Sequence, residues 1–150
     1  MRLNFKFAVL ALAAWSVSAA PTSACSCRRG DDARQQIIFQ EIMQEPGAVL
    51  AEVVVGDTDA PAPRRGRTNF KVLSFWAGTG GKTLTVVHNV SATGCGLDFH
   101  KGDRILLLAT NAEGVMSTGQ CPQRIASYAK VWGKDRIKLL MTPGAPERPQ

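Results

Sequence analysis

Four cysteines and the apolar segment before them restrict the possible folds of this sequence more than any other feature. Arg2 and Lys6 precede the apolar run FAVLALAAWSVSAA, and the cysteines follow at Cys25, Cys27, Cys95 and Cys121. A basic start, a short apolar run and small residues at its end are typical of a secretory signal peptide. We therefore expect export into an oxidising compartment, extracellular or periplasmic, where four cysteines form two disulfides.

The position of signal cleavage decides which residue begins the exported protein. Cleavage after Ala24 fits the small-residue rule and leaves Cys25 first, whereas cleavage after Ala19 leaves a short tail ahead of it. Lipid anchoring at Cys25 is disfavoured, because Thr22 stands where lipoprotein signals have a large aliphatic residue. We expect a signal peptide at 1–24, one domain at 25–142 and a disordered tail at 143–150, with no transmembrane segment in the mature protein.

The spacing of the cysteines leaves two disulfide pairings open. Four cysteines allow three pairings, and a bond between Cys25 and Cys27 would close a very small, strained ring. Both remaining pairings link the N-terminal segment to distant positions, and each closure restricts the unfolded chain strongly. A structural zinc site is disfavoured, because the usual CxxC pairs are missing.

The basic charge of the chain is modest after export. The sequence has 18 Lys and Arg against 12 Asp and Glu, a net charge of +6, and removal of Arg2 and Lys6 lowers it to +4. Part of the excess lies in PRRGR at 63–67, within a long proline-rich segment at 56–67 that we expect to be a loop. A polyanion is therefore a possible partner, whereas export makes nucleic acid an improbable one.

The apolar periodicity predicts one helix followed by several short strands. Asp31 and Asp32 can cap a helix that ends at Pro46. Its expected apolar face consists of Ile37, Ile38, Ile42 and Met43. Strands are expected at 48–55, 68–76, 82–90, 104–110 and 115–121, and a short helix at 124–132. The fold class is mainly β: a five- to six-stranded antiparallel OB-like barrel with an N-terminal helix and a short C-terminal helix.

No residue pattern in the sequence indicates an enzyme. His88 and His100 are the only histidines, no HExxH motif or carboxylate cluster accompanies them, and we expect both to be partly exposed. No serine lies in a nucleophile elbow, and all four cysteines are needed for disulfides. We therefore expect a binding protein without a cofactor of its own.

A set of short motifs in a fixed order resembles a known family. CSC follows the signal peptide, FWAG closes a strand, SATGCG precedes the apolar segment KGDRILLLA, and GQC follows that segment. Over roughly residues 25–125 this order is similar to the N-terminal inhibitory domain of the tissue inhibitors of metalloproteinases. That domain belongs to the netrin-like group of OB-type barrels.

The resemblance implies an inhibitor of zinc metalloendopeptidases. It implies disulfides Cys25–Cys95 and Cys27–Cys121, with the main-chain amine and carbonyl of Cys25 as ligands of the partner protease's zinc. Ser26 would enter the specificity pocket on the primed side of that protease. The wedge that contacts the protease would consist of Cys25, Ser26, Cys27, Ser91, Ala92, Thr93 and Gly94.

The chain departs from this family next to the wedge. Arg28 and Arg29 replace the small or apolar residues that usually follow the second cysteine. The alternative function is a non-inhibitory module with the same barrel, which recognises a polyanion or another exported protein through its basic loop at 63–67.

Overall fold

The computed structural model describes residues 26–62, 64–90 and 95–143. In chain order its elements are α1 (Asp32–Met43), β1 (Val49–Ala62), β2 (Arg65–Ala77), β3 (Thr83–Asn89), β4 (Arg104–Ala112), β5 (Val115–Ser117) and α2 (Gln120–Met141). The expected signal peptide, and all of the expected tail except its first residue, lie outside the described residues.

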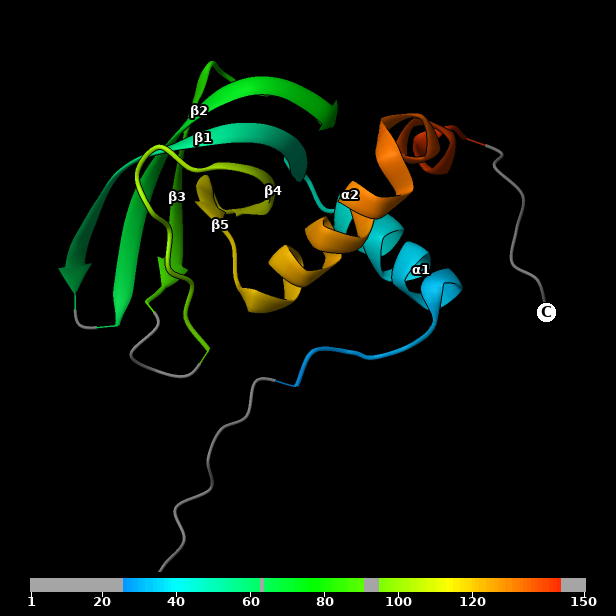
Figure 1. The fold of residues 1–150 in the computed structure, drawn as a ribbon, viewed down its shortest axis with the longest axis horizontal. Coiled ribbons are helices and arrows are strands. Elements are labelled where there is room, and N and C mark those ends of the chain that lie inside the picture. The colour runs from blue at the N-terminus through cyan, green and yellow to red at the C-terminus, as the bar shows by residue number, and fades with distance from the viewer. Residues whose placement is uncertain (1–25, 63, 91–94, 144–150) are drawn as a thin grey trace, which may run out of the picture.

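The strands form a closed five-stranded barrel in the order β1-β2-β3-β5-β4, with β4 pairing back onto β1. Neighbouring strands are antiparallel except for β3 and β5, which pair in parallel through Val87 and Ser117. The barrel and its two flanking helices confirm the mainly β, OB-like class, although the sheet is mixed rather than wholly antiparallel. Figure 1 shows α1 and the first part of α2 side by side at one end of the barrel.

Two apolar clusters explain why the sequence forms these strands. Side chains of alternate residues along β1, including Val53 and Val55, fill the barrel interior together with Phe70, Val86 and Leu107. The opposite faces of β1 and β4 are also buried, because the helices cover them. This second cluster joins Leu50, Leu106 and Leu108 to Phe39 of α1 and Ile125 of α2. The continuous apolar run in β4 thus reflects a strand buried on both faces.

The first helix begins at its predicted cap, whereas α2 begins at Gln120 rather than at residue 124 and is longer than predicted. Asp31 caps α1, since its side chain accepts a hydrogen bond from the Arg34 amide at 2.9 Å. Pro122 lies in the first turn of α2, where a missing N–H leaves no helical bond unmade. The helix turns sharply at Gly133, whose φ of 79° is unfavourable for other residues, and continues to Met141.

Two predicted segments were wrong. The segment at 56–67 was predicted to be a loop, but residues 56–62 and 65–67 continue β1 and β2 as a paired ribbon, in which Thr58 faces Thr68 and Asp59 faces Arg67. The predicted strand at 115–121 is restricted to Val115–Ser117, and Cys121 lies in the first turn of α2. None of the described helices is both long and apolar enough to span a membrane.

Candidate functional site

A disulfide fixes the segment that precedes α1. Cys27 is bonded to Cys121 in the first turn of α2, with their Cα atoms 5.2 Å apart, and this confirms one predicted pairing. Cys95 is also disulfide-bonded. Its predicted partner, Cys25, lies outside the described residues, so that pairing stays a prediction.

A buried glutamine of α1 also contacts the segment that precedes this helix. Gln35 of α1 is fully buried, and its Nε2 lies 3.5 Å from the carbonyl oxygens of both Arg28 and Gly30. These are long, partly buried hydrogen bonds to a segment whose residues Arg28 and Gly30 are exposed. The Gln35 Oε1 atom has no partner among the described residues. Together with the cap of α1 at Asp31, these contacts fix the path of residues 27–31.

Sequence reasoning missed Gln35, although a signal was present. Gln35, Phe39 and Met43 recur every four residues and form the buried stripe of α1, whereas Ile38 and Ile42 are only partly buried. A polar residue within a stripe of otherwise apolar residues indicates a buried group with a hydrogen-bonding role. The predicted apolar face therefore differed from the buried one. The prediction followed the apolar residues Ile37, Ile38, Ile42 and Met43 and ignored the single glutamine.

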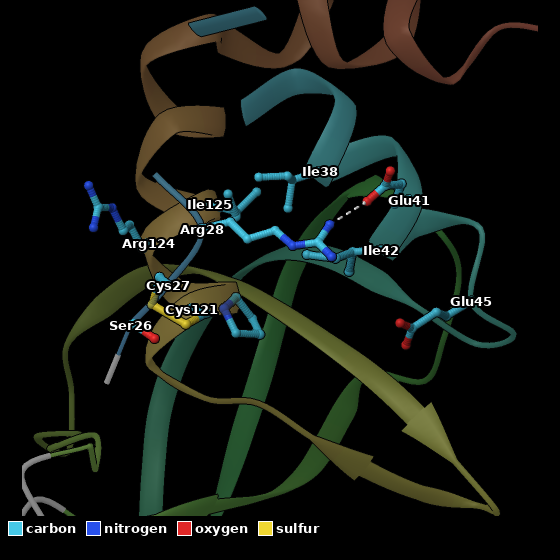
Figure 2. A pocket seen from close by; sticks show the side chains of 11 residues that line it. Ser26, Cys27, Arg28, Ile38, Glu41, Ile42, Glu45, Cys121, Arg124 and Ile125 are labelled. Atoms are coloured by element: carbon cyan, nitrogen blue, oxygen red, sulfur yellow. Dashed lines mark ion pairs between the residues drawn. A yellow bond between two sulfur atoms is a disulfide. The ribbon is translucent and has the colours of Figure 1, made fainter. Parts of the chain in front are cut away.

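A groove of about 340 Å³ lies between the fixed segment and the two helices. Ile38, Ile42 and Ile125 supply apolar lining, next to Pro122 and the disulfide. Charged side chains complete it: Arg28, Glu41, Glu45 and Arg124. Figure 2 shows Ser26 beside the disulfide at one end of this groove and Glu45 at the other. The fixed segment therefore borders a concave, partly apolar surface.

Arg28 is directed along this groove onto α1. Its Nη1 atom lies 3.6 Å from Oε2 of Glu41, and Figure 2 shows the side chain extended toward that carboxylate. Both side chains are largely exposed, so the ion pair contributes little to stability. It nevertheless partly neutralises a charge that the sequence places next to the expected wedge.

The predicted wedge is described only in part. Ser26 is exposed and Cys27 half-buried, whereas Cys25, Ser91, Ala92, Thr93 and Gly94 lie outside the described residues. Hydrogen bonds fix the residues on both sides of 91–94. The Val90 amide donates to the Arg64 carbonyl at 3.1 Å, and the Leu97 amide donates to the Asn89 carbonyl at 2.8 Å.

His88 is buried, which corrects the expectation that it is partly exposed. Its Nδ1 lies 3.1 Å from the Asn89 carbonyl oxygen, which only accepts, so Nδ1 donates in this hydrogen bond. Nε2 is hydrogen-bonded to the Thr68 hydroxyl at 2.8 Å, and that hydroxyl is hydrogen-bonded to Thr58 at 2.7 Å. Phe99 packs edge-on against the ring. His88 is thus a satisfied core residue.

The other candidate ligand residues do not converge on a metal site. His100 is exposed, and its Nδ1 lies 3.7 Å from a carboxylate oxygen of Asp103. Within residues 26–62, 64–90 and 95–143, no three His, Cys, Asp or Glu side chains come close enough to hold a metal ion. The chain matches no known protein-family model and no curated protein sequence.

Proposed function

We propose that this protein is an exported inhibitor of zinc metalloendopeptidases that acts through its N-terminal residue, and that it has no enzymatic activity. The observation that carries the proposal is the Cys27–Cys121 bond, which fixes the residues directly after the expected mature N-terminus while Ser26 stays exposed. A chain end held in this way loses little conformational freedom on binding, so more of the contact energy appears as affinity. The order of motifs shared with the tissue inhibitors of metalloproteinases supports the same function.

The proposed chemistry needs only main-chain atoms of Cys25. A catalytic zinc keeps one coordination position open for water, and an α-amine with its own carbonyl can replace that water as a five-membered chelate. An unperturbed α-amino group has a pKa of about 7.7–8.0, so a metal ion can displace its proton near neutral pH. The zinc belongs to the protease, and the inhibitor needs no cofactor of its own.

Ser26 is the proposed determinant of protease preference. Its exposed side chain follows Cys25 directly and precedes a residue fixed by a disulfide, so it is presented in a defined direction. The contact of Arg28 with Glu41 draws a neighbouring guanidinium toward α1. This arrangement favours binding of Ser26 in a pocket without interference from the Arg28 charge.

The test is inhibition by a protein that carries one extra residue. Inhibition constants are measured on a panel of zinc metalloendopeptidases for the chain that begins at Cys25 and for a chain with one alanine added before it. The extension converts the amine into an amide, so we expect affinity to fall on the order of a hundredfold or more. The urea midpoint of the extended chain serves as the control for folding. Equal inhibition by both chains, or none by either, would contradict the proposal.

A further inference from the structure

A second cavity, of about 260 Å³, lies at the seam where β3 meets β5. Its lining comes from β2, β3, the β4–β5 hairpin and the residue after β5: Arg65, Val87, His88, Asn89, Ala112, Val115, Ser117 and Thr118. None of the described lining residues carries a carboxylate. The cavity is partly apolar and partly polar, with a positive charge at Arg65.

The sheet register brings three hydrogen-bond donors to this cavity. Arg65 faces Asn89 across β2 and β3, and Ser117 of β5 is the partner of Val87, two residues before Asn89. The guanidinium, amide and hydroxyl groups of Arg65, Asn89 and Ser117 make no side-chain hydrogen bond or ion pair with any residue that the structure describes. His88 and Thr118 already use their side-chain polar atoms within the protein. Three donors from adjacent strands are thus available to one ligand.

We infer that this cavity binds a tetrahedral oxyanion, a sulfate or phosphate group. A guanidinium forms paired, charge-assisted hydrogen bonds to such oxygens, and the amide and hydroxyl can donate to the same group. Arg65 is the only Lys or Arg among the described lining residues, so the positive charge that would attract the anion comes from it. This site is separate from the proposed wedge and does not depend on it.

The test uses inorganic sulfate, inorganic phosphate and a heparin hexasaccharide as probes. Each is titrated into the ¹⁵N-labelled protein, and we expect amide shifts centred on Arg65, Asn89 and Ser117. Arg65→Gln is expected to weaken binding roughly tenfold, because it removes the only charged donor. Asn89→Asp, which adds a negative charge to an exposed position, is expected to weaken it at least as much.

Lys82→Gln is the matched control. Lys82 is an exposed cation just before β3, outside the cavity, and its removal lowers the net charge by the same unit as Arg65→Gln. We expect the dissociation constant of Lys82→Gln to stay within about twofold of that of the unsubstituted chain, because salt screens a distant charge. If the hexasaccharide binds at the same residues more tightly than free sulfate and phosphate do, the site is assigned to a sulfated polymer. If only free phosphate saturates the site, the site is assigned to the free ion. Equal losses for Arg65→Gln and Lys82→Gln, or no shifts at these residues, would overturn the inference.

Discussion

Cys27 and Cys121 are 94 residues apart in the sequence, yet their Cα atoms lie 5.2 Å apart. The bond joins the segment before the first helix to the first turn of the last one. It therefore links elements at opposite ends of the described chain and fixes the residues that follow the expected mature N-terminus. Stability and proposed function depend on the same covalent contact.

Removing this disulfide is expected to destabilise the fold substantially. The Cys27→Ser, Cys121→Ser variant releases a long loop in the unfolded state, so the free energy of unfolding should fall by about 2–5 kcal/mol. Urea unfolding followed by circular dichroism measures the change. An unchanged midpoint would mean that the bond adds little to the stability of the barrel and helices.

The buried threonine beside His88 is expected to matter more than an exposed one on the neighbouring strand. Thr68→Val removes the hydroxyl that joins His88 to Thr58, and leaves buried polar atoms without partners, at a cost of about 1–3 kcal/mol. Thr85→Val removes an exposed hydrogen bond to Asn69 and should cost under about 0.5 kcal/mol. Similar losses in the two variants, measured by urea unfolding, would refute the role of the buried network.

The layer between helices and barrel is expected to carry much of the stability. Phe39 is fully buried there and contacts Trp132 edge-on with ring centres 6.0 Å apart, so Phe39→Ala should cost about 3–5 kcal/mol. Val131 of α2 is 84% exposed, and Val131→Ala should change stability by less than about 0.5 kcal/mol. Thermal unfolding of both variants checks this contrast, which fails if Val131→Ala is the more damaging change.

The ion pair at the groove is expected to affect the wedge without affecting stability. Because Arg28 and Glu41 are largely exposed, Glu41→Gln should change the free energy of unfolding by less than about 1 kcal/mol. The same variant releases the Arg28 guanidinium and should alter inhibition constants in a salt-dependent way, if the proposed function holds. Inhibition measured at low and high salt tests this. A salt response identical to that of the unsubstituted chain would show that the pair is irrelevant to binding.

The barrel could be predicted from the sequence where apolar residues mark its interior. Val53, Phe70, Val86 and Leu107 follow strand patterns, and the structure places them in one core. The ribbon at 56–67 lacked this signal, because most of its described residues are exposed. Thr58 bonds to Thr68, and Thr68 bonds to His88, so polar side chains interrupt the apolar alternation where these strands continue.

Other differences arise from contacts between distant residues. The predicted helix at 124–132 ends where the backbone leaves the helical conformation, at Gly133, but the helical segment that follows it was missed. Ile137 of that segment is buried within the helix–barrel cluster, and this contact favours its helical continuation to Met141. The groove and the orientation of Arg28 toward Glu41 depend on how α1 packs beside the disulfide. Neither has a local sequence pattern, although the motifs around Cys27 did predict which cysteine it bonds.

The most direct test of the central claim is mass spectrometry of the exported protein, digested without reduction. The account predicts an N-terminal peptide that begins at Cys25 with an unmodified amine and is joined by disulfides to the peptides of Cys95 and Cys121. A peptide that begins before Cys25, or one that carries an acyl group on this residue, would contradict it, since the amine would then be unable to bind a protease's zinc.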